Sequence, residues 1–260
     1  MKTQDITTSS RYAKDRAETL RNRANLATNR NLLVWYQQLY REQFRDLGSI
    51  DGLNVLEIGS GVSPLHLFYP SVLTSDVLDL DYVDYVFDCH EIDKIQAIAD
   101  GSLDAITLTN VVHHLKRPIE FFRKAAAKLK KGGVIIAAEP YFSLLSTFIY
   151  KHFHPEPVDF SIEQPELKEV TGPLSSANGP LAWLIFTRPK WRKALEEDFE
   201  FETGSFRPFS ALAYFVTGGI SRRIPIPNAL YRLFFPVDLW LSRLFPRIFA
   251  SFFIITLTRK

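Results

Sequence analysis

The spacing of apolar residues predicts helices that cover an alternating α/β core. Residues 11–47 carry apolar and aromatic side chains at helical spacing until Gly48, which predicts helix over this stretch. From residue 53, short apolar runs alternate with amphipathic segments. The predicted strands are 54–58, 72–77, 85–87, 103–109 and 133–138, and 119–129 is a predicted helix that ends at Lys130-Lys131-Gly132-Gly133. This alternation predicts a parallel, doubly wound sheet.

The alternation stops after residue 140. Residues 151–180 are rich in Pro, Glu and polar side chains, which predicts an irregular insertion. A short charged helix is predicted over 188–198, and strands over 199–206 and 252–258. Between these strands, 208–250 is apolar, aromatic and basic, and its prolines are expected to interrupt regular structure.

These patterns divide the chain into four parts. They are an N-terminal helical cover (1–48), a ligand-binding core (49–142), a substrate-side insertion with a helical and aromatic segment (143–250) and a last core strand (251–260). The helical cover either packs on the core or acts as a lid over a bound ligand.

Composition excludes several classes of protein. The single cysteine, Cys89, rules out an intrachain disulfide and a zinc site built from several cysteines. A reducing, cytoplasmic setting fits this usage. Residues 1–10 are polar and do not resemble a signal peptide. The longest uncharged stretches fall short of the roughly 20 residues that span a bilayer.

The net charge of +2 hides an asymmetry along the chain. Residues 51–104 hold eleven acidic side chains and one lysine, whereas 220–260 hold seven basic side chains and one aspartate. The acidic part suits a cationic ligand. The basic aromatic part either lies on an anionic membrane surface or packs on the core or a second copy. Its arginines are scattered among aromatics without a recognition motif, so no nucleic-acid partner is expected.

The strongest local motif lies at the end of the first predicted strand. Residues 55–64 read Val-Leu-Glu-Ile-Gly-Ser-Gly-Val-Ser-Pro. Gly59 and Gly61 flank Ser60 and let the backbone approach a ligand closely, and Glu57 can reach a ligand amine. A dinucleotide site would have a third glycine where Ser63 stands, and an acid in the turn suits pyrophosphate poorly. A plain tight turn is the alternative.

Acidic residues follow the next two predicted strands. Asp76 ends the second strand and can accept both hydroxyls of a ribose, with Asp79 and Asp81 as neighbouring alternatives. Asp88 follows the third strand and can accept from an exocyclic adenine amine, beside Cys89. The alternative for Asp88 is a helix cap, which would bind free backbone amides.

Polar residues also follow the fourth predicted strand. Asn110, His113 and His114 lie at the carboxyl end of a parallel strand, where open α/β sheets place their sites. A histidine there serves as a base or a polar wall, or it packs and caps. Two adjacent histidines without further ligands do not make a metal site, so no metal is expected.

Taken together, these motifs resemble those of class I S-adenosylmethionine-dependent methyltransferases over about residues 50–140. The resemblance implies a Rossmann-like, mostly parallel seven-stranded sheet with helices on both faces and an α-rich insertion before the last strand. It implies S-adenosylmethionine as cofactor. Its methionine part would be held by Glu57, Gly59, Ser60 and Gly61, its ribose by Asp76 and its adenine by Asp88 and Cys89, with Asn110 also in the site. Ser63 departs from the family pattern.

The second half resembles a branch of these enzymes associated with bacterial surface-polysaccharide genes. The resemblance rests on Glu139-Pro140-Tyr141, on the His154–Asp159 loop and on Asn178. It implies a sugar among the possible methyl acceptors. We expect transfer to an oxygen or nitrogen of a small molecule, a sugar or a lipid-linked sugar, the last reached by peripheral membrane contact through the basic aromatic part. The candidates for a general base are His113, His154 and Glu139.

Two other functions fit parts of the pattern. An NAD(P)-dependent oxidoreductase would use a similar sheet, but Glu57 and the missing third glycine argue against it. A non-catalytic adaptor or membrane-surface scaffold would keep the core without its chemistry. Titration with S-adenosylmethionine and with NADH distinguishes these hypotheses from methyl transfer.

Overall fold

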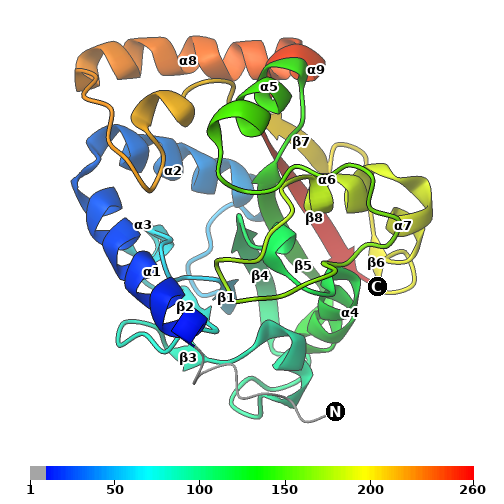
Figure 1. Cartoon of the computed structure of the whole chain (residues 1–260). Coiled ribbons are helices and arrows are strands. Elements are labelled where there is room, and N and C mark those ends of the chain that lie inside the picture. The colour runs from blue at the N-terminus through cyan, green and yellow to red at the C-terminus, as the bar shows by residue number, and fades with distance from the viewer. Residues whose placement is uncertain (1–9) are drawn as a thin grey trace.

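A single mixed sheet organises the described part of the chain. The structure is a computed structural model that describes residues 10–260, so the first nine residues of the predicted helical cover lie outside it. Eight strands have the order β3-β2-β1-β4-β5-β8-β6, and β7 also pairs with β8 (Figure 1). The strands are β1 (Val55–Ile58), β2 (Leu73–Asp76), β3 (Tyr85–Val86), β4 (Leu103–Thr109), β5 (Leu129–Pro140), β6 (Phe199–Glu200), β7 (Phe206–Phe209) and β8 (Phe252–Arg259).

The first five strands are parallel, as the alternating pattern predicts. In register, Ile58 of β1 lies beside Ser75 of β2 on one side and Leu108 of β4 on the other. The strand order reverses between β1 and β4, because β2 and β3 lie on one side and β4 and β5 on the other. Ligands bind at such a switch point in open α/β sheets, outside the carboxyl ends of the strands.

The other edge of the sheet is antiparallel. β8 pairs along β5 from Phe252 to Thr258, and β6 and β7 both pair with the far side of β8. The single strand predicted over 199–206 is therefore wrong in its bounds. A turn closed by the Ser205 amide on the Glu202 carbonyl, with Gly204 at φ 84°, breaks the edge strand in two. The predicted seven strands thus become eight.

Helices cover both faces of the sheet. The α-helices are α1 (Ser10–Thr28), α2 (Arg30–Gln43), α3 (Leu65–Phe68), α4 (Pro118–Lys128), α5 (Leu144–Phe153), α6 (Pro180–Thr187), α7 (Pro189–Lys193), α8 (Asn228–Leu244) and α9 (Pro246–Phe249). The 3-10 helices are η2 (Arg45–Leu47), η3 (Cys89–Lys94), η4 (Val112–His114) and η5 (Phe215–Thr217). One core cluster joins α4 and α6 to the sheet, and another joins α2 and α8 to its opposite face.

The long helix predicted over 11–47 is interrupted. Asn29 separates α1 from α2, since its side-chain oxygen accepts from the Leu32 amide and caps α2. Its side-chain nitrogen donates to the Thr217 carbonyl, which lies far along the chain. This long-range contact fixes the break, so the local periodicity could not reveal it.

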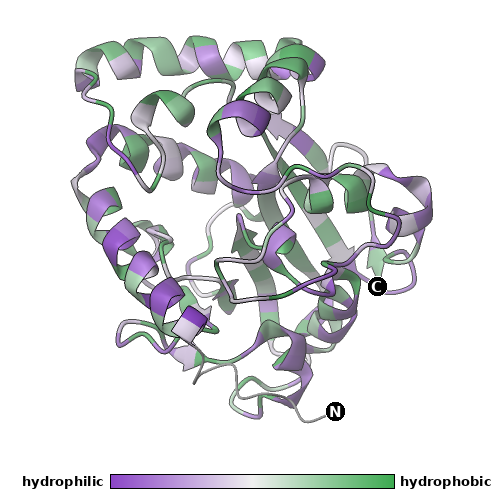
Figure 2. Cartoon of the chain, in the orientation of Figure 1, coloured by the Kyte–Doolittle hydropathy of each residue, from purple (hydrophilic) through white to green (hydrophobic). Residues whose placement is uncertain are grey.

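The segment 208–250 holds a helix that runs through a proline. α8 contains Pro236, although this proline was expected to interrupt regular structure. Burial of Tyr231 and Phe235 on the inner face of α8 holds the helix together across this residue. Figure 2 shows α8 as a mainly hydrophobic helix at one edge of the molecule. Within residues 10–260, no helix combines the length and the apolar character that crossing a bilayer requires.

Candidate functional site

The glycine turn after β1 packs against its neighbouring strands. The amides of Gly59 and Ser60 both donate to the Ser75 carbonyl of β2, at 2.9 Å. Gly59 has φ 78°, and a Cβ at this position would lie 2.4 Å from the Val111 side chain beyond β4. Only glycine fits both constraints. The turn therefore brings the ends of β1, β2 and β4 together.

Glu57 is a buried carboxylate with one oxygen left over. Its Oε1 accepts from the Ser63 hydroxyl at 2.5 Å, and the Tyr40 hydroxyl lies 2.8 Å from the same Ser63 oxygen. Its Oε2 is buried and has no hydrogen-bond partner among the described residues. Burial raises the pKa of Glu57 to about 7, although the Ser63 hydrogen bond opposes the shift. The serine at the third glycine position thus orients Glu57.

Asp76 lies directly across from the glycine turn. Its Oδ2 accepts from the Gly61 amide at 2.8 Å and its Oδ1 from the Leu78 amide at 2.9 Å. Burial raises the pKa of Asp76 above its usual value. Asp79 and Asp81 are exposed instead. Among the three acids weighed from the sequence, Asp76 is the one placed at the strand ends.

Asp88 and Cys89 begin η3. The Asp88 carboxylate accepts from the His90 amide at 2.9 Å and lies 2.7 Å from the His90 ring Nδ1. Burial would raise the pKa of Asp88, but the hydrogen bonds from His90 hold it below its usual value. Cys89 is buried. Asp88 therefore caps this short helix, which was the structural alternative, and lies beyond β3 as expected.

Asn110 supplies a second buried acceptor without a partner. It follows β4 with φ 57°, a left-handed conformation that is uncommon for a residue with a side chain. Its amide donates to the Ala138 carbonyl at 2.8 Å, while its Oδ1 is buried without a partner in residues 10–260. Strained backbone of this kind concentrates at functional sites. Two buried acceptors, on Glu57 and Asn110, thus remain unsatisfied at the carboxyl ends of the strands.

Helix α1 covers the glycine turn. A Cβ on Gly61 would lie 2.8 Å from the Thr19 side chain of α1. Arg23 of α1 donates to the Ser63 carbonyl at 3.3 Å and stacks on the Tyr82 ring, whose hydroxyl donates to the Gly61 carbonyl at 2.8 Å. The predicted helical cover therefore touches the turn itself.

The same helix is tied to the insertion through Asp15. Its buried carboxylate accepts from the backbone amides of Leu174 and Ser175, at 3.0 and 3.1 Å, and from the Ser175 hydroxyl. The carbonyl of the next residue, Ser176, lies 2.8 Å from the His114 Nδ1. Asp15 thus links the cover over the glycine turn to the histidines beyond β4.

Glu139 and His113 form a buried pair at the ends of β5 and β4. The Glu139 Oε1 accepts from the amides of Val111 and Val112, at 2.8 and 2.7 Å. Its Oε2 lies 2.6 Å from the His113 Nδ1. Burial by itself would lower the pKa of His113, but the charges of Glu139 and Glu156 raise it to about 10. Glu139 therefore fixes both the turn and the imidazole.

Glu156 joins the candidate site, although the base candidates chosen from the sequence did not include it. Its carboxylate lies 3.3 Å from the His113 Nε2 and 3.8 Å from the His114 Nε2, with the His154 Nδ1 at 3.9 Å. Burial would raise the pKa of Glu156, but His113 holds it far below its usual value. The signal was the His154-Pro155-Glu156-Pro157 turn, in which only the histidine was selected. We call His113, His114, His154 and Glu156 the histidine–glutamate cluster.

Asn178 holds the Glu156 loop beside β4. Its amide donates to the His113 carbonyl at 3.0 Å, and its side chain exchanges two hydrogen bonds of 2.9 Å with the backbone of Asp159. The insertion is irregular here, as predicted, but these bonds place it over the strand ends.

A family comparison identifies the class of protein. The model of a methyltransferase domain family matches residues 13–195, which include the glycine turn, the strand ends and the whole histidine–glutamate cluster. The chain belongs to this family. Membership confirms the prediction of a methyltransferase with S-adenosylmethionine as cofactor, and it disfavours the oxidoreductase. None of the curated proteins compared with the chain gives a significant match.

Solved methyltransferases share the fold at low sequence identity. A S-adenosylmethionine-dependent methyltransferase from Thermotoga maritima, described as a possible histamine N-methyltransferase, is 13% identical. The match covers 90% of this chain and 92% of that one, with a TM-score of 0.51. A S-adenosylmethionine-dependent methyltransferase from Archaeoglobus fulgidus is 16% identical, with 86% and 94% of the two chains covered and a TM-score of 0.47. The Thermotoga likeness shows the Rossmann-like fold.

The strand ends fit the cofactor of this family. S-adenosylmethionine carries an ammonium and a sulfonium, and the unpaired oxygen of Glu57 is a buried acceptor suited to a cation. The unpaired Oδ1 of Asn110 accepts a further donor. Gly59 and Gly61 let the turn pack closely against Val111 and Thr19, which holds the backbone at the strand ends. The residues present therefore match the ligand in charge and in hydrogen-bonding capacity.

Proposed function

We propose that this methyltransferase transfers a methyl group to an oxygen or nitrogen of an acceptor held against the histidine–glutamate cluster. The observation that carries the proposal is the unpaired, buried Glu57 oxygen at the same strand ends from which His113 and Glu139 project. When bound, the cofactor supplies an electrophilic methyl group on a sulfonium.

Residues on the β1, β2 and β3 side would hold the cofactor. Glu57 would bind its ammonium, next to the turn of Gly59, Ser60 and Gly61, and Asp76 would accept from its ribose hydroxyls. Asp88, with Cys89, would face its adenine, and Asn110 would accept at the switch point. Each assignment rests on the placement of these residues at the strand ends and on the family's cofactor.

The cluster on the β4 and β5 side would receive the acceptor. Glu139 is fully buried and both of its oxygens are engaged, so it acts as a positioning residue rather than as a base. Both ring nitrogens of His113 face carboxylates. Of the three base candidates, His154 is the one with a partly exposed side chain. We therefore assign proton removal from the acceptor to His154.

Methyl transfer from isotopically labelled S-adenosylmethionine to a panel of sugars, polyols and amines tests this proposal. We expect one class of acceptor to be labelled. His154→Gln should lower kcat by about 10²–10³-fold while cofactor affinity stays unchanged, as loss of a general base predicts. Full turnover by His154→Gln would contradict its role. Labelling of none of these acceptors by a protein that binds the cofactor would contradict the acceptor classes.

A second feature, an exposed apolar surface, bears on the kind of acceptor. The outer side of α8 and α9, with the adjoining side of α5, exposes large apolar side chains to solvent. We call this the apolar outer surface; it comprises Leu144, Phe148, Leu230, Leu233, Val237, Trp240, Leu244, Phe245 and Ile248. Leu233 is 76% exposed, whereas Tyr231 and Phe235 on the opposite side of α8 are buried. In Figure 1 the three helices lie together at one end of the molecule.

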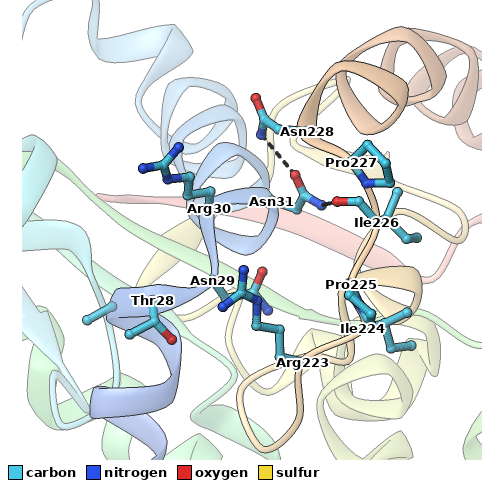
Figure 3. A pocket seen from close by; sticks show the side chains of 11 residues that line it. Thr28, Asn29, Arg30, Asn31, Arg223, Ile224, Pro225, Ile226, Pro227 and Asn228 are labelled. Carbon is cyan, nitrogen blue, oxygen red and sulfur yellow. Dashed lines mark hydrogen bonds between the residues drawn. The ribbon is translucent and has the colours of Figure 1, made fainter.

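Cations lie beside this surface at the start of α8. A cavity of about 650 Å³ separates the α1–α2 junction from residues 223–228, and Arg30 and Arg223 line it (Figure 3). Asn31 braces its wall by donating to the Ile226 carbonyl and accepting from Asn228. Arg232 lies on the neighbouring part of α8. An apolar helix face with arginines at its edge suits an anionic bilayer.

We infer that the apolar outer surface binds anionic membrane, which favours a lipid-linked acceptor. Flotation with vesicles that contain or lack anionic phospholipid tests this inference. The wild-type protein should float with anionic vesicles, and Leu233→Glu combined with Trp240→Glu should abolish flotation. Leu67→Glu, at a residue 67% exposed on α3, is the matched control and should float as wild type does. Equal flotation of all three proteins, or of none, would contradict the inference.

A further inference from the structure

Two adjacent histidines turn the same ring nitrogen toward one carboxylate. The His113 Nδ1 is held by Glu139 at 2.6 Å, and the His114 Nδ1 by the Ser176 carbonyl at 2.8 Å. Both acceptors keep a proton on Nδ1, so in the neutral rings both Nε2 atoms carry a lone pair. The Glu156 carboxylate lies opposite them, at 3.3 and 3.8 Å.

These separations match those between ligands of one metal ion. Nitrogen and oxygen ligands lie about 2.1 Å from Zn²⁺, so two of them in a tetrahedral site are about 3.4 Å apart. The three ligand atoms of His113, His114 and Glu156 all lie within 4.8 Å of one another. The bonds from Glu139 and Ser176 are the outer contacts that orient metal-binding histidines in proteins.

We propose that His113, His114 and Glu156 bind one divalent first-row transition metal ion. The two adjacent histidines by themselves do not make a metal site, and the fold adds the third ligand from the insertion. Two imidazoles and one carboxylate suit Zn²⁺, Fe²⁺, Co²⁺ or Mn²⁺ rather than Ca²⁺.

The acidic groups around the cluster favour a bound cation. Glu139 and Glu156 bring two carboxyl groups to the histidines, and the ion-pair partners given to them by residues 10–260 are all histidines. A dication bound at the Nε2 atoms of His113 and His114, with the imidazoles neutral, would lie among these carboxyl groups. The competing state has a proton on His113 between the two carboxylates. Metal binding and this proton exclude each other at the His113 Nε2.

The second group of potential ligands, Asp88, Cys89 and His90, is a poorer site. The His90 Nδ1 lies 2.7 Å from Asp88 itself, and its Nε2 accepts from the Arg117 amide at 3.2 Å. Both ring nitrogens are therefore occupied within the protein. In the histidine–glutamate cluster, by contrast, the Nε2 atoms of His113 and His114 both face the Glu156 carboxylate.

The proposed ion has an open side. The His113 side chain is 3% exposed, whereas that of Glu156 is 27% exposed. Three protein ligands with one open side are typical of catalytic rather than structural metal sites. The ion would bind the acceptor oxygen and lower its pKa, which makes it a better nucleophile. This catalytic part rests on the proposed function; the binding of the metal does not.

Titration of the chelator-treated full-length protein with Co²⁺ tests the site without any turnover. We expect one Co²⁺ per chain, visible d–d absorption bands, and displacement of the bands by Zn²⁺. His114→Gln and Glu156→Gln should each weaken Co²⁺ binding at least tenfold, and Glu139→Gln should weaken it 10–100-fold through His113. The control His152→Gln, at an exposed histidine of α5, should bind as wild type does.

The outcomes separate this proposal from the function proposed above. Circular dichroism identifies variants that fold, and only folded variants are compared. No Co²⁺ binding by the wild-type protein, or unchanged binding by both His114→Gln and Glu156→Gln, would overturn the metal site. Calorimetry with S-adenosylmethionine on the same metal-free sample reports separately on the cofactor site. Binding of S-adenosylmethionine without binding of Co²⁺ would support the cofactor site and contradict the metal site. Binding of Co²⁺ without binding of S-adenosylmethionine would support the metal site and contradict the cofactor site.

Discussion

Glu57 and Asp238 are buried carboxylates in two regions of the molecule that treat them in opposite ways. Asp238 of α8 accepts from the amides of Ala211, Leu212 and Ala213, at 2.6–2.8 Å, and from the Ser210 hydroxyl at 2.9 Å. Glu57 accepts from one hydroxyl, and its other oxygen has no partner among the described residues. One carboxylate is saturated by the protein, and the other is left for a ligand.

The difference follows from the cost of burying charge. A buried carboxylate is tolerated when hydrogen bonds replace its hydration, as they do at Asp238. There the bonds join the middle of α8 to the turn that follows β7, which is a structural role. At Glu57 the missing hydrogen bonds destabilise the folded protein, and binding of a cationic ligand would offset this cost. The missing partner at Glu57 thus indicates a ligand site, whereas the four donors to Asp238 indicate a structural role.

The largest expected effect is on the scaffold side. Asp238→Ala removes the acceptor of four donors and should lower the free energy of unfolding by about 4 kcal/mol, measured by urea denaturation. Cofactor affinity of the folded fraction should not change. A loss below about 1 kcal/mol would mean that the saturated carboxylate does not hold α8 in place.

The next effect is the pH dependence of stability at Glu57. Its pKa of about 7 in the folded protein exceeds its ordinary value of 4.5, so the folded state binds the extra proton between these values. Stability from this group is therefore full below pH 4.5 and lost as the pH rises to 7, by roughly 3 kcal/mol. Glu57→Gln should remove this slope from urea-denaturation midpoints. An identical slope in both proteins would contradict the assignment.

The same substitution should weaken cofactor binding. Glu57→Gln replaces a charge-assisted hydrogen bond to an ammonium with a neutral one, which is worth about 2 kcal/mol, or roughly 30-fold in Kd. Calorimetric titration measures it. The contrast with Asp238 is clearest if Glu57→Gln stabilises the protein at pH 8 and yet weakens binding of S-adenosylmethionine. A Glu57→Gln variant that binds S-adenosylmethionine as tightly as wild type would contradict this contrast.

The smallest effect should come from Ser63. Ser63→Ala removes the hydroxyl that donates to the Glu57 Oε1 and the partner of the Tyr40 hydroxyl. We expect about a fivefold rise in the Kd for S-adenosylmethionine, equivalent to about 1 kcal/mol. Ser210→Ala, which removes one of the four donors to Asp238, is the matched control and should leave the Kd unchanged.

Local sequence was sufficient for the parts of the fold that depend on nearest neighbours. Buried parallel strands are continuous apolar runs, so β1 to β5 were predicted to within a few residues. The break at Asn29, the turn that splits β6 from β7 and the helix through Pro236 depend on contacts with distant segments. Periodicity along the chain carries no information about such contacts.

The candidate site divides in the same way. Glu57, Asp76 and Asn110 follow strands whose ends the sheet brings together, so the strand pattern alone placed them. Glu156 arrives on an irregular insertion, held beside His113 by Asn178. No periodic pattern marks such a loop, so the sequence does not show that Glu156 lies beside the histidines. The pairing of His113 with Glu139 likewise needs the β4–β5 register.

The most direct test of the central claim is calorimetric titration of the wild-type protein and Glu57→Gln with S-adenosylmethionine and, separately, with NADH. The unpaired carboxylate predicts micromolar binding of S-adenosylmethionine by the wild-type protein, weaker binding by Glu57→Gln, and no binding of NADH by either. Equal affinity of both proteins for S-adenosylmethionine, or binding of NADH alone, would contradict the claim that Glu57 is kept unpaired for a cationic cofactor.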